Sequence, residues 1–262
     1  MDVYVINLDR QTERLRWMEH GLAAVGVPFR RVPAVDAARL SSAFVARMTD
    51  GNGRKLTRYE IALVMSHRKA WRALLRSRAP HALVFEDDVH IGRDFAALLT
   101  ALDAGEAAFD IVKLESVGER VLVDTGSGRR VAGRLLCPLR SAYMGAAGYV
   151  INRRAAAKLL RVTRTMAVPA DWFLFADSYL ASNGLVVLQT VPGIVAQEEH
   201  LRKLAPSAEM RSGQPFRVDS PTLIDKAVRE AARPLRQFAA AFARRRLMRA
   251  EPGLRWGRIG FE

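Results

Sequence analysis

The 262-residue chain has one cysteine, few aromatic residues and no long run of apolar residues. A single cysteine, Cys137, can form neither an intrachain disulfide nor a zinc cluster, and it suits a reducing compartment. Without an uncharged apolar stretch of about 18 residues, we expect no membrane-spanning helix. The chain opens directly with the strand-like residues 3–6, so we expect no secretory signal. We therefore expect a cytoplasmic protein.

The dinucleotide fingerprint Gly-X-Gly-X-X-Gly is also missing after the first predicted strand, which argues against a nicotinamide-dependent enzyme. Residues 3–8 and 29–35 have the apolar character of strands, and a helical spacing of Leu15, Met18 and Leu22 lies between them. This strand–helix–strand order is typical of the opening of a Rossmann-like parallel sheet.

Basic residues greatly outnumber acidic ones, giving a formal net charge of +14 and a pI near 10.9. Such a charge attracts nucleic acid, anionic membrane surfaces or phosphorylated substrates. Aromatic residues are not interleaved with the basic ones as stacking platforms, so no nucleic acid is expected as a partner. A basic nucleic-acid-binding protein nevertheless stays as an alternative function.

Arginines are dense near the C-terminus, where residues 221–248 have the apolar spacing of a helix interrupted at Pro234. An amphipathic, arginine-rich helix can lie on an anionic bilayer, or its apolar face can pack on the rest of the protein. We expect the first, with the protein peripheral on the inner face of the cytoplasmic membrane. The arginines are Arg229, Arg233, Arg236, Arg244, Arg245, Arg246, Arg249, Arg255 and Arg258.

The most informative segment is 81–89, in which four apolar residues end abruptly in Glu86, Asp87 and Asp88. The apolar run predicts a buried strand, and ligands of α/β sheets bind beyond the carboxyl ends of strands. Carboxylate oxygens favour a hard cation such as Mg²⁺ or Mn²⁺, which leaves positions open for substrate phosphates. The alternative is a strand followed by a solvated acidic turn.

Other segments add further carboxylates. Residues 109–114 are predicted to form a strand that ends at Glu115, and Asp171 lies at the start of a predicted helix. Gly145 and Gly148 suggest backbone that passes close to a ligand or another element. Thr57 and Glu60 match a capping box at the start of another helix.

Several segments, taken in order, resemble glycosyltransferase family 25, the bacterial lipooligosaccharide glycosyltransferases. The resemblance covers roughly residues 1–200, and none is seen beyond them. It is carried by residues 3–10 with Glu13 and Arg14, and by 56–62, 66–71, 84–89, 109–115, 148–151 and 168–172.

The resemblance implies a GT-A-type fold, a nucleotide-diphosphate sugar donor and usually a divalent metal, with UDP-galactose as the default donor and inversion at the anomeric carbon. The expected fold class is therefore α/β: a Rossmann-like mixed sheet flanked by helices. We place a catalytic domain at 1–200. A mobile loop and a basic amphipathic helical segment make up 201–262.

The resemblance also assigns roles, each with an alternative. Glu86 and Asp88 are expected to point the same way and hold Mn²⁺ or Mg²⁺, while Asp87 points oppositely toward the donor ribose or sugar. A late metal ligand is expected at His200, which could instead belong to a polar loop.

Donor-binding residues are expected at the end of the first strand and beyond it. Arg14 could instead form a surface salt bridge, and a helical histidine such as His67 is often structural. The donor-binding set is Asn7, Leu8, Arg10, Arg14, His67 and Asp87.

An inverting transfer needs a general base, for which Asp171 and Glu115 are the two candidates. The acceptor would be a lipid-linked or envelope saccharide. A family member that has lost catalysis and only binds sugar nucleotides is a further alternative.

Overall fold

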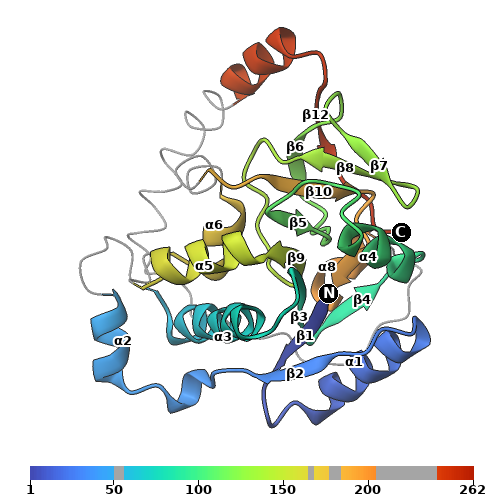
Figure 1. Ribbon diagram of the computed structural model, residues 1–262. Coiled ribbons are helices and arrows are strands. Elements are labelled where there is room, and N and C mark those ends of the chain that lie inside the picture. Colours follow the sequence, from blue (N-terminus) through green and yellow to red (C-terminus); the bar gives the residue numbers. More distant parts are fainter. Residues whose placement is uncertain (50–55, 165–167, 177–183, 205–240) are drawn as a thin grey trace.

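The computed structural model describes residues 1–49, 56–164, 168–176, 184–204 and 241–262 (Figure 1). The strands are β1 Asp2–Asn7, β2 Arg30–Pro33, β3 His81–Glu86, β4 Val89–Ile91, β5 Ile111–Lys113, β6 Arg120–Asp124, β7 Arg129–Val131, β8 Arg134–Pro138, β9 Gly148–Asn152, β10 Val187–Val191, β11 Val195–Gln197 and β12 Leu254–Arg258. The helices are α1 Thr12–Ala24, η1 Ala37–Arg39, α2 Ser42–Thr49, α3 Arg58–Arg76, α4 Phe95–Asp103, α5 Arg153–Val162, α6 Ala170–Phe175 and α8 Glu198–Leu204.

Within these residues the main sheet has eight strands in the order β2-β1-β3-β9-β5-β10-β8-β7. The strands β1, β2 and β3 are parallel, which confirms the Rossmann-like opening, whereas β9 runs antiparallel between β3 and β5. Ile6 is paired with Val32 on one side and with Glu86 on the other. The carboxyl ends of β1 and β3 therefore lie together, next to the predicted acidic site.

Helices cover both faces of the sheet, as Figure 1 shows. In β3 the alternation of side chains sends Ala82 and Val84 into one hydrophobic cluster and Leu83 and Phe85 into another. The first cluster includes residues of α3, α5 and α6, and the second includes residues of α1 and α4. The predicted α/β class, a mixed sheet flanked by helices, is confirmed.

The start of helix α3 is fixed by hydrogen bonds between residues that are close in sequence. The Thr57 side chain accepts a hydrogen bond from the Glu60 N–H, and the Glu60 side chain accepts one from the Thr57 N–H at 2.8 Å. This is the predicted capping box. Ile61, Trp71 and Leu74 are fully buried along the helix, which fixes its rotation against the sheet.

The region after Gln197 differs from the expected mobile loop. Residues 198–204 form α8, whose first residue is tied to the acidic turn by the Glu198 N–H donating to the Asp88 carbonyl at 2.9 Å. Most of the predicted helix 221–248 lies outside the described residues, but 241–250 are helical. Residues 201–204, expected to be a loop, are the end of α8, and the rest of the expected loop lies outside the described residues.

The last residues pack against residues 1–200, which the predicted division at residue 200 did not anticipate. The strand β12 pairs antiparallel with β6, and Ile259 is buried in the core cluster that α3 also lines. The Ser116 hydroxyl donates to the Ile259 carbonyl at 2.5 Å. This part of 201–262 is therefore packed on the domain instead of extending from it. No helix in the described part of the chain is long and apolar enough to cross a membrane.

Candidate active site

The acidic triplet lies at the carboxyl end of β3, beside the end of β1. Glu86 is the last residue of β3, and Asp87 and Asp88 form the turn into β4. From the end of β1, the Asn7 side-chain amide donates to Asp87 Oδ2 at 2.7 Å and to the Gln11 carbonyl at 2.9 Å. Asn7 therefore joins the turn before α1 to the acidic turn.

Arg14 of α1 is directed at the same turn. Its Nη1 lies 3.1 Å from Asp87 Oδ1 and 3.3 Å from Asp88 Oδ2. Burial lowers the pKa of Arg14, but Asp88 and Asp87 outweigh this and raise it. Burial also raises the pKa of Asp87, against the opposing effect of Arg14 and Asn7. Arg14 is thus a fixed cation at the site, in place of the alternative surface salt bridge.

Arg31 of β2 also contacts the end of β1, and no local sequence pattern predicts it. Its Nε donates to Asn7 Oδ1 at 2.9 Å, and its Nη2 donates to the Asn7 carbonyl at 3.1 Å. Arg10, predicted to bind the donor, pairs with Asp36 and remains half exposed. The Leu8 carbonyl accepts the Gln11 N–H at 2.9 Å. Arg10 and Leu8 lie in the turn after β1, where their donor-binding roles remain predictions.

His67 lies behind Glu86. Its side chain is fully buried, with Nε2 3.5 Å from Glu86 Oε1 and Nδ1 2.9 Å from the Tyr149 hydroxyl. Trp71 Nε1 donates to the same hydroxyl at 2.8 Å, so that hydroxyl can donate to Nδ1 and leave the ring hydrogen on Nε2, facing Glu86. Burial lowers the pKa of His67 to about 3. His67 is thus placed between Glu86 and Tyr149, and its role in binding the donor remains a prediction.

Carboxylates surround Glu86. Burial, and then Asp88, Glu115, Asp87 and Asp171 in decreasing order, raise its pKa well above the usual range. The five acids predicted at separate points of the sequence therefore act on one another in the folded protein. Such a concentration of negative charge favours a cation among the carboxylates.

The carboxylate oxygens of this site suit a hard divalent cation that protein groups coordinate only in part. Glu86 and Asp88 supply carboxylate oxygens, and the Gln197 amide donates to Asp88 Oδ1 at 3.3 Å. Among the described residues, no group of three or more His, Cys, Asp or Glu side chains is arranged to hold an ion. His200 Nε2 lies 3.2 Å from Glu199 Oε1, so its role as a metal ligand remains a prediction. Mg²⁺ is commonly held in this way, with one or two carboxylates, substrate phosphates and water.

The two candidate bases differ in accessibility. The Glu115 side chain is fully buried, and its Oε2 accepts hydrogen bonds from Lys113 Nζ at 3.1 Å and from the Ala147 N–H at 3.0 Å. Asp171 is partly exposed in the first turn of α6, and its Oδ2 accepts the Gly145 N–H at 3.2 Å. Solvent therefore reaches Asp171 but not the Glu115 side chain, and the role of either as the base remains a prediction.

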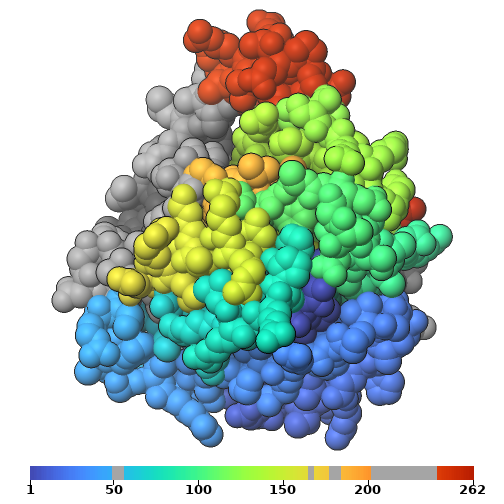
Figure 2. All heavy atoms as spheres, in the orientation of Figure 1, coloured from blue at the N-terminus to red at the C-terminus, as the bar shows by residue number. Residues whose placement is uncertain are grey.

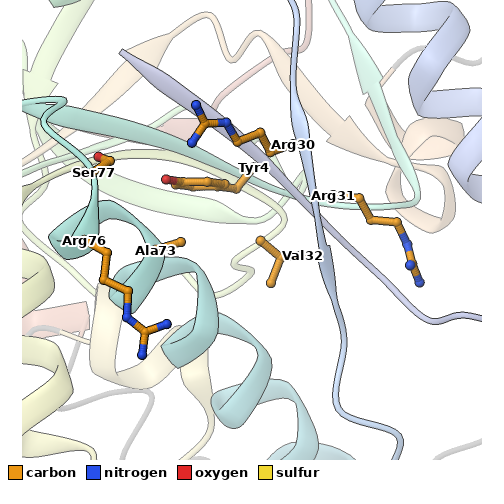
Figure 3. A pocket seen from close by; sticks show the side chains of 7 residues that line it. All are labelled: Tyr4, Arg30, Arg31, Val32, Ala73, Arg76 and Ser77. Carbon is orange, nitrogen blue, oxygen red and sulfur yellow. The ribbon is translucent and has the colours of Figure 1, made fainter.

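A pocket of about 340 Å³ lies elsewhere, between β1, β2 and the end of α3 (Figure 3). Arg30, Arg76 and the Tyr4 ring line it, while the Arg31 side chain points away from it in the view. Tyr4 stands two residues after the start of β1, whereas Glu86 is paired with Ile6 near the end of that strand. Because this pocket lacks the acidic cluster, we place the active site at the carboxyl ends of β1 and β3.

Comparison with known proteins gives the family. The model of glycosyltransferase family 25 (LPS biosynthesis protein) matches residues 1–174. The lacto-N-neotetraose biosynthesis glycosyltransferase LgtB of Neisseria meningitidis serogroup B is 30% identical, over 78% of this chain and 78% of that protein. LgtE of the same organism is 29% identical over 78% and 76%, and the lipooligosaccharide biosynthesis protein lic2B of Haemophilus influenzae is 26% identical over 76% of each chain.

Solved structures resemble the fold only distantly. Mannose-1-phosphate geranyltransferase from Thermus thermophilus has a TM-score of 0.43 at 14% identity and covers 79% of each chain. A structure of LgtC has a TM-score of 0.37 at 13% identity, over 75% of this chain and 86% of that one. The assignment rests on the sequence match, which spans the acidic turn, Glu115 and Asp171: this chain belongs to glycosyltransferase family 25 and is a glycosyltransferase.

Proposed function

We propose that this glycosyltransferase transfers galactose, with inversion, from UDP-galactose to a lipooligosaccharide or related cell-surface glycan, and that it depends on Mn²⁺ or Mg²⁺. The gathering of Glu86, Asp87 and Asp88 with Asn7 and Arg14 carries the proposal, because it combines a cation site with donors for phosphate. The names of LgtB, LgtE and lic2B support the acceptor class.

Different residues of the chain would bind the cation, the diphosphate and the nucleoside of the donor. Glu86 and Asp88 would hold the cation, which as a Lewis acid neutralises charge that develops on the leaving diphosphate. Arg14 already lies within 3.1 and 3.3 Å of Asp87 and Asp88, and its remaining N–H groups can donate to a phosphate. Asn7 and Arg31 fix the end of β1, against which the nucleoside would rest.

Asp171 is the proposed general base. One of its oxygens is held by the Gly145 N–H and the other by the Trp172 N–H at 3.0 Å, and the residue is partly exposed to solvent. It would take the proton from the acceptor hydroxyl as that oxygen bonds to the anomeric carbon and the bond from this carbon to the diphosphate oxygen breaks. Attack opposite the leaving group gives inversion.

The C-terminal helix is proposed to place the enzyme on an anionic membrane surface. In residues 241–250, Phe242 is 67% exposed and shares a face with Arg245, Arg246 and Arg249. Arg244 faces the protein, where its guanidinium lies 3.8 Å from the centre of the Trp256 ring. The helix projects at one end of the molecule, beside the β6–β8 region (Figure 2). Each arginine at an anionic surface contributes about 1 kcal/mol.

The donor and the reaction are tested with a panel of nucleotide sugars and truncated lipooligosaccharide, with Mn²⁺ or with chelator. We expect metal-dependent release of UDP from UDP-galactose, lost in Asp88→Ala and retained in the control Asp103→Ala, which changes an aspartate at the far end of α4. Donor binding without transfer to any acceptor would favour the non-catalytic sugar-nucleotide module. Salt-sensitive binding of random oligonucleotides without donor binding would favour the nucleic-acid alternative.

The membrane proposal is tested by co-sedimentation with vesicles that contain anionic lipid. We expect the double variant Arg245→Glu, Arg246→Glu to lose most of the binding, and the exposed α1 control Arg16→Glu to retain it. Equal binding by all three proteins would overturn this part of the proposal.

A further inference from the structure

The buried ion pair between Lys113 and Glu115 is not explained by the proposed chemistry. Both side chains are fully buried and their charged atoms lie 3.1 Å apart. Lys113 Nζ also lies 4.3 Å from the centre of the Phe175 ring and 5.3 Å from that of Tyr143. A buried ion pair commonly contributes little to stability compared with apolar residues of similar size, so its presence calls for another reason.

The pair forms hydrogen bonds with the backbone that precedes β9. Lys113 Nζ donates to the Gly145 carbonyl, and the Ala147 N–H donates to Glu115 Oε2 at 3.0 Å. Gly145 has φ +92°, and a Cβ there would lie 2.7 Å from Glu115 Oε2 and 2.9 Å from Oε1. Residues 145–147 are therefore held at both ends by the pair, with glycine required at the point of closest contact.

The same backbone holds Asp171. The Gly145 N–H donates to Asp171 Oδ2 at 3.2 Å, so the N–H that binds Asp171 and the carbonyl that Lys113 binds belong to the same residue. Phe175, on which the Lys113 ammonium rests, lies in α6 together with Asp171. Lys113 thus contacts both the backbone that binds the Asp171 carboxylate and the helix that carries it.

We propose that Lys113 and Glu115 are positioning residues, which fix the Asp171 carboxylate for catalysis by holding the Gly145 backbone and α6. This inference rests on the proposed role of Asp171 as general base. It replaces the predicted catalytic role of Glu115, whose side chain has no access to an acceptor. Displacement of a catalytic carboxylate by about 1 Å can lower the rate on the order of 100-fold. Contacts that hold the base in place would prevent this loss.

The main test is the double variant Lys113→Met, Glu115→Gln, which removes both charges and so leaves neither one unpaired in the core. We expect kcat to fall about 10- to 100-fold while the KM for UDP-galactose changes less than about twofold, because the donor contacts other residues. The control is Asp110→Asn, Arg154→Met, which removes another ion pair at the opposite end of β5. The control is expected to lower Tm without lowering kcat.

A double-mutant cycle separates positioning from general stability. If the pair acts through Asp171, adding Lys113→Met and Glu115→Gln to the Asp171→Asn variant causes no further fall in kcat. Losses that multiply, or a double variant with wild-type kcat and lowered Tm, would overturn the inference while the role of Asp171 stands. Wild-type turnover by Asp171→Asn would overturn the proposed base, and this inference with it.

Gly145→Ala supplies a second variant in case the double variant does not fold, since it keeps both charges. Its methyl group would press on the Glu115 carboxylate and move the peptide that binds Asp171. We expect the same fall in kcat with little change in donor KM. A folded Gly145→Ala enzyme with wild-type kcat would contradict the proposal.

Discussion

The burial of His67 predicts a specific loss of stability in acid. The pKa of the fully buried His67 is lowered to about 3 by burial, against about 6.5 for an unfolded histidine. The histidine therefore takes up a proton only on unfolding, once the pH falls below about 6.5. Its contribution to stability is fully present above that pH and decreases as the pH falls toward the folded pKa.

The size of the effect follows from proton linkage. Between pH 7.5 and pH 5, the difference between the two pKa values lowers the free energy of unfolding by about 2 kcal/mol. We expect His67→Gln, which cannot titrate, to lose about 2 kcal/mol less than the wild type over the same interval.

Urea unfolding of both proteins at the two pH values measures this difference. The contributions of titrating groups that do not contact His67 cancel in the comparison. His81→Gln serves as a matched control, because His81 is a partly exposed histidine at the start of β3. Equal losses by wild type and His67→Gln would refute the reasoning that His67 is kept neutral by burial.

Three further substitutions test the packing around the site by urea unfolding. Thr57→Ala removes the cap of α3 and should cost about 1 kcal/mol; no loss would show that the capping box is dispensable. Tyr149→Phe leaves Trp71 Nε1 buried without its acceptor and should cost about 1–3 kcal/mol, whereas an unchanged free energy of unfolding would contradict this. Gly148→Ala puts a Cβ 2.7 Å from Val195 Cγ1 and should cost about 1–3 kcal/mol, and a more stable variant would show that Val195 moves aside freely.

The local parts of the fold were predictable because they depend on neighbours in sequence. The apolar runs of β1 and β3, the helical spacing of α1 and the capping box at Thr57 each occupy a short segment, and the structure confirms all of them. The acidic turn was recognisable because it directly follows an apolar strand. Asn7, Arg14 and the acidic turn were predicted as site residues, and the structure brings them into contact.

Contacts across the sheet could not be read from the sequence. Arg31 reaches Asn7 only because β2 pairs in parallel with β1, a register that no local pattern in the sequence specifies. Lys113 interrupts an apolar strand and gives no sign that it will be fully buried on aromatic rings. The family motif placed His67 at the site but could not show that Glu86 would lie in front of it.

The C-terminal strand was missed for a related reason. In β12, Arg255, Trp256 and Arg258 resemble a basic tail, and the pairing partner β6 lies more than a hundred residues earlier in the chain. A short strand of this kind is stabilised by its partner and by the burial of Leu254 and Ile259, which no local pattern reveals. The dense C-terminal arginines thus include residues of a packed strand as well as of an exposed helix.

The central claim is that the sugar donor binds at the carboxyl ends of β1 and β3, and calorimetric titration of UDP-galactose with Mn²⁺ tests it most directly. The variants are Asp88→Ala at the proposed site and Arg76→Ala in the pocket between β1, β2 and the end of α3. We predict that Asp88→Ala abolishes Mn²⁺-dependent binding and that Arg76→Ala binds as the wild type does. Binding that survives Asp88→Ala and is lost in Arg76→Ala would contradict the account.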